Sequence, residues 1–297
     1  MDESGDGSRA ALPSVLVESL APFSHLVCSR DGLFAVNHKE WVRVAGGSYF
    51  GATVIGHQAI VFENSDRTPV GGRLLALDLR RLAEFEELAS GLDPQCHQLD
   101  QVRGRITIID TENQRLLAVD DNGAMSIVAR PLPATERKYA AGYVHFNSLL
   151  EVGAIVYVMA HNGGAATGVP SRVLALDDEW KIVDQFLIPG FGCHNIVVLE
   201  DGSFMFCDSV RGSLISRTGL LAHVDDLFLR GLSVTDDEIV VGASQYAERP
   251  SRRTVSGRVH FLDRSFRSRA VLQLPAAPTE VRRLWGDDLG MSNYGAR

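Results

Sequence analysis

Three histidines recur along the chain at nearly equal spacing, and their chemistry suits a metal site. His97, His145 and His194 are separated by 48 and 49 residues, and each begins a short strand-like segment. Neutral imidazole is the commonest metal ligand in proteins, and three imidazoles on a rigid frame leave coordination positions for water or substrate. We therefore expect these side chains to hold a divalent metal ion. Zinc suits the ligand set best, while iron, manganese and nickel stay open because ligand type alone does not choose among them.

Two other interpretations of the same histidines compete with a metal site. The imidazoles can line a wet channel, each hydrogen-bonded to water or to a neighbouring carbonyl oxygen. Alternatively, they can transfer protons without a metal. The metal site is the stronger hypothesis because three consecutive repeats carry histidine at one register, whereas the other repeats carry different residues there.

Those other repeats place Tyr49, Arg230 and Glu280 at the corresponding positions. Glu280 is a candidate fourth ligand or general base, and Tyr49 is a candidate proton donor. Arg230 can anchor a substrate carboxylate through paired N–H donors. An ion pair between Arg230 and Glu280 that simply lines the channel is the alternative.

Further candidates lie close to these positions in the sequence. Asn147 follows His145 by two residues, so it points the same way along a strand and can contact substrate. His161 begins a long loop and is a candidate catalytic acid or base, with a solvated loop histidine as the alternative. Cys96 and Cys193 precede histidines, but strand alternation turns them away, so we expect buried structural thiols.

An internal repeat explains how the chain brings these residues together. The candidate positions recur at intervals of 36 to 50 residues. Each interval contains four short segments rich in β-formers, most clearly CHQLDQV, RITIID, RLLAVD and AMSIVAR between residues 96 and 130. Four strands in each period of this length are typical of propeller blades. The sequence therefore predicts an all-β propeller.

The two ends of the repeat complement each other. Residues 24–45 match the second, third and fourth strands of a blade, and residues 279–288 match a first strand with nothing after it. Joining them completes a sixth four-stranded blade and removes the open sheet edges. We expect residues 12–297 to form one six-bladed domain after a disordered lead-in at residues 1–11. Five blades with a loose C-terminus are the alternative.

Two segments have no single interpretation. Residues 12–22 fit either a short helix or an extra strand. In residues 79–90, LRRLAEFEELAS has apolar residues at helical spacing, whereas the phase of the repeat predicts an outer strand.

One face of the predicted ring collects the candidate residues. In antiparallel blades, the starts of first strands and the loops between second and third strands lie on the same face. Three of these loops are long, at residues 64–72, 161–171 and 245–257. Long loops in a compact domain are often kept for binding, so we expect them to wall a pocket at the channel mouth.

The turns of the repeat carry a family resemblance. Residues 110–115 read DTENQR, which resembles the D-T-x-N-x-R turn of NHL repeats, and residues 208–211 read DSVR, a degenerate version. This resemblance extends along nearly the whole chain and implies a six-bladed propeller. The segments HNI at 194–196, FLRGLSV at 228–234 and VGAS at 241–244 also resemble a bacterial propeller family of unknown function.

Among NHL-type propellers, peptidylglycine amidating lyases hold a catalytic zinc with histidines from different blades. The resemblance implies that His97, His145 and His194 are the matching ligands. It also implies a loose correspondence of the lyase tyrosine and arginine to Tyr49 and Arg230. We expect neither the secretory setting nor the disulfides of those lyases here, which argues against a peptide substrate.

Composition limits the classes of partner. The chain has 297 residues with a net charge of −8, which argues against nucleic acid or an anionic membrane as the main partner. Its four cysteines are too few to staple a chain of this length, which favours reduced thiols and a cytoplasmic location. No apolar stretch approaches the roughly 20 residues of a membrane span.

The functional hypothesis combines these points. We expect a metal-dependent lyase, hydrolase or isomerase that acts on a small polar, carboxylate-bearing substrate at the channel mouth. A propeller that only binds a protein or small ligand on its rim is the alternative, because this fold hosts many unrelated functions. A metal-free lactonase-like or synthase-like enzyme is a third hypothesis, which activity after chelation would distinguish. The sequence does not predict an oligomeric state.

Overall fold

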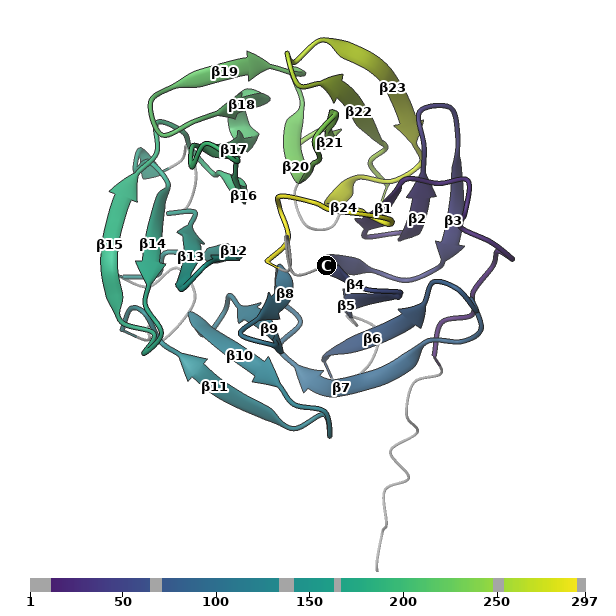
Figure 1. Ribbon diagram of the computed structural model, residues 1–297, viewed down its shortest axis with the longest axis horizontal. Coiled ribbons are helices and arrows are strands. Elements are labelled where there is room, and N and C mark those ends of the chain that lie inside the picture. The colour runs from purple at the N-terminus through teal and green to yellow at the C-terminus, as the bar shows by residue number, and fades with distance from the viewer. Residues whose placement is uncertain (1–11, 65–70, 134–141, 163–166, 248–253, 293–297) are drawn as a thin grey trace, which may run out of the picture.

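The computed structural model describes residues 12–64, 71–133, 142–162, 167–247 and 254–292. The chain folds into a ring of six four-stranded sheets around a central axis (Figure 1). Five sheets are continuous in sequence, with all neighbouring strands antiparallel. Blade one comprises β4 (Tyr49–Ile55), β5 (Gln58–Glu63), β6 (Gly72–Asp78) and β7 (Glu86–Leu92). Blade two comprises β8 (Leu99–Val102), β9 (Arg105–Asp110), β10 (Arg115–Val119) and β11 (Met125–Ala129). Blade three comprises β12 (Phe146–Val152), β13 (Ile155–Ala160), β14 (Arg172–Leu176) and β15 (Ile182–Leu187).

The other three blades follow the same order around the ring. Blade four comprises β16 (His194–Val198), β17 (Phe204–Asp208), β18 (Ser213–Ile215) and β19 (Leu220–His223), with a 3₁₀ turn, η2 (Ser209–Arg211), before β18. Blade five comprises β20 (Phe228–Val234), β21 (Glu238–Ser244), β22 (Gly257–Asp263) and β23 (Ser268–Leu274). Blade six comprises β24 (Pro278–Arg283), β1 (His25–Ser29), β2 (Gly32–Val36) and β3 (Trp41–Ala45).

Blade six confirms the predicted closure of the ring. β24 from the C-terminal region pairs antiparallel with β1, with Val281 opposite Val27 and Glu280 opposite Cys28. In Figure 1 the yellow β24 lies beside the purple β1, at the point where the two ends of the propeller meet. This pairing places β1 between β24 and β2, so β1 is not left as an open edge, and β24 takes the innermost position of the blade.

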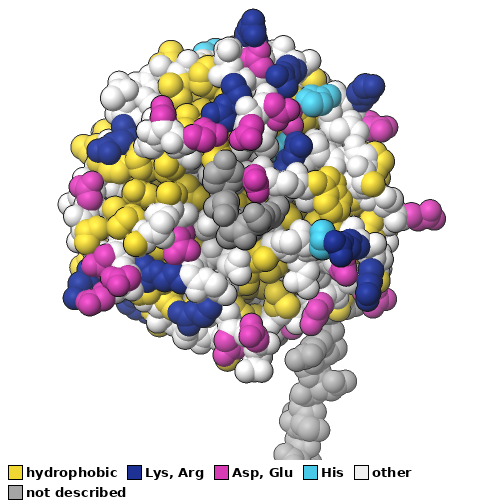
Figure 2. All heavy atoms as spheres, in the orientation of Figure 1, with side chains coloured by type: hydrophobic (Ala, Val, Ile, Leu, Met, Phe, Trp, Pro, Cys, Tyr) yellow, Lys and Arg dark blue, Asp and Glu magenta, His cyan; other side chains and the backbone are white. Residues whose placement is uncertain are grey.

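The core lies between the faces of neighbouring blades. Between blades one and two, Phe62 and Leu74 pack in one cluster with Leu99 and Ile108, and all four are fully buried. The outer strands have exposed apolar side chains instead, such as Val183 and Leu187 of β15. Figure 2 shows hydrophobic side chains gathered on the left of one face, over blade three, with acidic and basic side chains interspersed elsewhere.

Bulges interrupt the innermost strands close to their starts. The pairing register slips in blades one, three, four and five, and also where β24 pairs with β1. A bulge adds a residue to one strand and redirects a side chain. The residues inserted at these slips include Phe50, Asn147, Asn195, Arg230 and Thr279. All five line cavities on the propeller axis.

The two ambiguous segments have clear outcomes. Residues 12–22 form neither a helix nor a full strand; Ser14 makes one isolated bridge to Glu84, and the amide of Leu16 donates to Val44. Residues 79–85 are turns and irregular structure, and the outer strand β7 begins at Glu86, as the repeat phase predicted. The expected lead-in at residues 1–11 lies outside the described residues. Among the described residues there is no helix with the length and hydrophobicity that a membrane span requires.

Candidate functional site

A cavity of about 730 Å³ opens at one end of the central channel. Starts of first strands and loops between second and third strands line it, which confirms the face predicted from the repeat. Five of the predicted site residues contribute to its wall: His97, His145, His161, His194 and Arg230. Its volume lies within the range of roughly 300–1,000 Å³ that is typical of small-molecule sites.

Backbone carbonyl groups fix the imidazoles of His97 and His194 in the same way. Nδ1 of His97 lies 2.7 Å from the carbonyl oxygen of Gln95, and Nδ1 of His194 lies 3.0 Å from that of Gly192. A carbonyl oxygen can only accept, so each Nδ1 must carry the hydrogen. In the neutral ring this leaves the lone pair on Nε2, the nitrogen that can accept a proton or bind a metal.

The repeat supplies a second partner for each of these rings. Oγ1 of Thr111 and Oγ of Ser209 each lie 2.9 Å from Nδ1 of the histidine in their own blade. Thr111 and Ser209 directly follow Asp110 and Asp208. The turns that resemble NHL repeats therefore orient the two histidines.

The other two histidines complete a chain of imidazole contacts. The ring centroid of His145 lies 4.9 Å from that of His97 and 4.9 Å from that of His161. The ring of His161 continues to His194 at 5.4 Å. The hydroxyl of Tyr143 lies 3.2 Å from Nδ1 of His145. His161 therefore lies between His145 and His194 and joins the predicted set.

Burial and a nearby positive charge keep two of these imidazoles neutral. Burial, followed by the charge of Arg230, lowers the pKa of His161 to about 4. The same two causes, in the same order, hold the pKa of His194 well below its usual value, with smaller contributions from His161 and His97. Neutral imidazole is the form that accepts protons and binds metals.

The predicted metal site is not formed by the side chains as they lie. Within the described part of the chain, no group of three or more His, Cys, Asp or Glu side chains is arranged to hold a metal ion. The imidazole of His161, which is not one of the predicted ligands, contacts those of both His145 and His194. His97 and His194 are in the tautomer that can bind a metal through Nε2. The predicted ligands are nevertheless not arranged so that they could hold one ion together.

Two predicted site residues lie below the mouth of the channel. Asn147 and Glu280 line a second, much smaller cavity of about 10 Å³, together with Asn195 and Arg230. Nδ2 of Asn147 donates to the carbonyl of Cys193 at 2.8 Å, whereas its Oδ1 is buried and has no hydrogen-bond partner among the described residues. Nδ2 of Asn195 donates to Oε1 of Glu280 at 2.9 Å. Neither Asn147 nor Glu280 lines the larger cavity.

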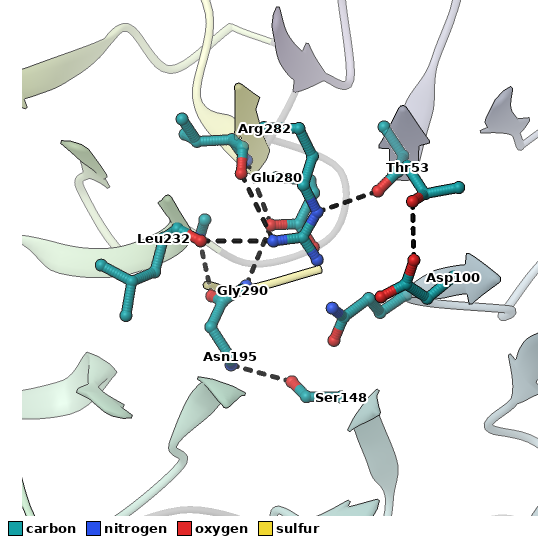
Figure 3. A network of polar contacts seen from close by, with 12 residues as sticks. Thr53, Asp100, Ser148, Asn195, Leu232, Glu280, Arg282 and Gly290 are labelled. Carbon is teal, nitrogen blue, oxygen red and sulfur yellow. Dashed lines mark hydrogen bonds and ion pairs between the residues drawn. The ribbon is translucent and has the colours of Figure 1, made fainter. Parts of the chain in front are cut away.

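A buried arginine, Arg282, lies beside Glu280 in the network of polar contacts among the innermost strands (Figure 3). Arg282 is fully buried, and its guanidinium donates to the carbonyls of Ala52 at 3.0 Å and Leu232 at 3.2 Å. It also lies 3.4 Å from Oε2 of Glu280. Burial raises the pKa of Glu280, while Arg282 acts in the opposite direction. This arrangement indicates that Glu280 is part of the structural network of the channel.

Tyr49 lies outside both cavities. It is fully buried, its hydroxyl donates to the carbonyl of Gly46 at 2.9 Å, and its ring stacks on Phe85. Burial, with the carboxylate of Glu63, raises the pKa of Tyr49. The bulge between Tyr49 and Gly51 instead directs Phe50 toward the channel. The structure thus gives Tyr49 a place in the core, where it cannot deliver a proton to the cavity.

The two cysteines that precede histidines are buried, as expected. Cys96 and Cys193 have no exposed surface, and burial raises the pKa of both thiols. Their side chains pack in the hydrophobic clusters between blades.

Several residues of the cavity were not identified from the sequence. Arg30 and Phe50 line it from blades six and one, and Phe228 and Tyr246 line it from blade five. The aromatic residues resemble ordinary core positions in the sequence. Arg30 lies in the two-residue turn between β1 and β2, where a charged residue gives no distinctive signal.

Comparisons with known proteins support only the fold. No protein-family model matches the sequence, and no curated protein matches it. The resemblance to NHL proteins and amidating lyases therefore does not establish membership of either group.

Solved structures do match. A nidogen/laminin complex contains a chain with a TM-score of 0.61 and 8% identity, covering 88% of this chain and 98% of that one. A protein of unknown function from Bacteroides caccae has a TM-score of 0.57 and 10% identity, covering 88% and 98%. A protein provisionally named a gluconolactonase has a TM-score of 0.55 and 12% identity, covering 78% and 80%. At these identities the likeness shows the propeller fold alone.

Proposed function

We propose that the chain is an enzyme of the lyase, hydrolase or isomerase type that acts on a carboxylate-bearing small molecule in the cavity at the channel mouth. The observation that supports this most is the shared anchoring of His97 and His194. Both rings hold Nδ1 on a backbone carbonyl, which in the neutral ring places the lone pair on Nε2. Arg230 lines the same cavity and supplies a positive charge for the substrate.

The proposed reaction uses these residues in separate roles. Arg230 binds the substrate carboxylate and fixes its orientation. A neutral imidazole, His194 or His97, accepts a proton from the substrate through Nε2. The Nδ1–H of that ring stays bonded to the backbone carbonyl, which stabilises the imidazolium that forms. The imidazolium then gives this proton to the leaving group or product, either directly or through the ring of His161, which contacts His194, so that all the imidazoles are neutral again after turnover.

A metal-dependent version is the second candidate. A backbone carbonyl on Nδ1 is also what orients histidines that bind metals through Nε2. In this version His97, His145 and His194 would have to move from the arrangement described above to hold the divalent ion, zinc first, which would supply Lewis-acid chemistry. No proton-transfer step above depends on it.

Turnover measured on a library of small carboxylates tests the proposal. We expect at least one compound to be converted, as followed by proton NMR, and His97→Gln to reduce the rate by roughly 100-fold or more. His223→Gln, an exposed histidine on β19, is the matched control and should retain full activity. Arg230→Gln should raise KM more than it lowers kcat, because it removes a binding contact.

Chelation and elemental analysis separate the two versions of the proposal. Activity that survives chelation in metal-free protein supports metal-free proton transfer. Activity that is lost on chelation and restored by zinc supports the three-histidine metal site. Tight binding of a carboxylate without any turnover would instead support a non-catalytic binding protein.

A further inference from the structure

The cavity has a second chemical character beside its histidines. From His194 a row of aromatic rings leads outward to the surface. The ring of Phe228 lies 5.6 Å from that of His194, and the ring of Tyr246 lies 5.6 Å from that of Phe228. All three residues line the cavity. The wall therefore changes from polar and buried to aromatic and exposed.

The outer part of this wall exposes apolar surface that a folded protein usually buries. Tyr246 is 70% exposed, and Val210, which also lines the cavity, is 46% exposed. Large apolar side chains exposed together on one concave surface mark a ligand site more often than scattered ones do. Because aromatic rings pair favourably at centroid separations of roughly 4.5–7 Å, a further ring can stack on this row.

The charges of the same cavity favour an anion. The guanidinium carbon of Arg30 lies 4.5 Å from the centre of the Phe50 ring, and that of Arg230 lies 5.5 Å from it. Two positive charges therefore lie near one aromatic ring of the cavity wall. Asp226 is the one acidic residue among the described residues that line the cavity. It lies 3.1 Å from His223, and its side chain is 99% exposed.

We propose that the substrate is an aromatic carboxylate, with its ring on Phe228 and Tyr246 and its carboxylate on Arg230. This inference rests on the proposed function, and it names the class of substrate for that site. The size of the cavity supports it, because about 730 Å³ is far more than a simple aliphatic acid fills. The arrangement places the part of the substrate between ring and carboxylate beside the imidazole of His194.

Binding of 2-naphthoate, measured by its own fluorescence, tests this inference on the full chain. We expect one bound molecule per chain. Acetate, which keeps the carboxylate without the ring, should compete only at roughly 100-fold higher concentration, since the lost ring contact removes most of the apolar burial. The uncharged analogue 2-naphthylmethanol should bind roughly tenfold more weakly than 2-naphthoate, because it lacks the charge-assisted contact.

Two variants assign the contacts. Tyr246→Ser should weaken 2-naphthoate roughly three- to tenfold and leave acetate unchanged, because only the ring contact is lost. Arg230→Gln should weaken both anions roughly tenfold or more. Leu220→Ser is the matched control, since Leu220 is 67% exposed on β19 and does not line the cavity.

The outcomes separate the substrate class from the proposed function. Equal competition by acetate and 2-naphthoate, unchanged 2-naphthoate binding in Tyr246→Ser, or no 2-naphthoate binding would each overturn the aromatic class. Acetate binding that still requires Arg230 would then leave the proposed function standing. If Arg230→Gln binds both anions as wild type does, the carboxylate anchor of the proposed function fails as well.

Discussion

The hydroxyl of Thr111 lies 2.9 Å from Nδ1 of His97. The same hydroxyl donates its own hydrogen to the carbonyl of Phe146 in the next blade, 2.7 Å away. Its oxygen therefore accepts from the imidazole, which fixes the tautomer of His97 and ties it to the junction between blades two and three. Ser209 makes the equivalent contact with His194 in blade four.

Replacement of Thr111 by Val tests this positioning role. The variant removes the hydroxyl with little change in volume, so we expect a loss of about 1 kcal/mol in the free energy of unfolding. We also expect the preference of His97 for the Nδ1–H tautomer to weaken, because only the carbonyl of Gln95 then accepts that hydrogen, and ¹⁵N NMR of the ring nitrogens reports the change directly. Catalytic rate should fall roughly tenfold, since ligands and bases depend on such supporting groups.

Thr107→Val is the matched control for this variant. Thr107 is also buried in blade two, on β9, but does not line the cavity. An unchanged ¹⁵N spectrum for His97 in Thr111→Val, with the same stability loss in both variants, would reduce Thr111 to a purely structural residue.

The fold was predictable because the propeller repeats a simple pattern. Each blade places apolar residues on strands such as β9 and polar residues in turns such as Asp110–Arg115, where Nε of Arg115 lies 2.6 Å from Oδ2 of Asp110. The missing first strand at the N-terminus and the extra strand at Pro278–Arg283 predicted the closed sixth blade. Alternation of apolar and polar residues and the choice of turn residues are local features of the sequence, so these regularities can be recognised from the sequence alone.

The candidate site was only partly predictable, because bulges change the direction of side chains. The repeat placed Tyr49 and Glu280 at the same register as the histidines, but Tyr49 is in the core and Glu280 is in the channel network. The bulge brings Phe50 to the cavity in place of Tyr49. A slip of one residue reverses the face of a strand residue, and no sequence signal marks where the slip occurs.

Glycine at position 231 makes one of these bulges possible, and its replacement by alanine should disrupt it. Gly231 has a φ of 84°, and an added Cβ would lie 2.7 Å from the amide nitrogen of Val281. We expect Gly231→Ala to lower the free energy of unfolding by about 2–4 kcal/mol, because the backbone strain and the clash add together. Denaturant unfolding measures this loss.

A glycine without close neighbours provides the comparison. Gly153 has a φ of 60°, and an added Cβ would meet no atom of the described residues within 4 Å, so Gly153→Ala should cost only about 1 kcal/mol. Because Arg230 directly precedes Gly231, the first variant should also weaken anion binding. Equal losses of unfolding free energy in the two alanine variants would show that the close contact between β20 and β24 is not what excludes a side chain at position 231.

The buried guanidinium of Arg282 should be essential to stability. Arg282→Met leaves the carboxylate of Glu280 buried without its charged partner, and we expect a loss of about 3–5 kcal/mol in the free energy of unfolding. The double variant Arg282→Met with Glu280→Gln should recover part of this loss, because it removes the uncompensated charge.

Arg267→Met is the control. Its ion pair with Asp263 is at the surface, with the arginine side chain 81% exposed, so the loss should be below about 1 kcal/mol. Similar urea midpoints for Arg282→Met and Arg267→Met would contradict the role of Arg282 in the channel.

Acid should destabilise the protein partly through His25, which lines neither cavity. His25 is fully buried, and burial, followed by the charges of Arg283 and His38, holds its pKa well below the usual 6.5. In the unfolded chain His25 binds a proton as the pH falls through about 6.5, whereas in the folded chain it stays neutral. Stability from this group is therefore complete above pH 6.5 and declines as the pH falls from there toward the lower folded pKa.

Urea unfolding at pH 7.5 and pH 5.5 should show a smaller acid-induced loss in His25→Leu than in wild type, while His223→Leu, at an exposed position, should match wild type. An identical acid-induced loss in wild type and His25→Leu would mean that other groups account for the whole pH dependence.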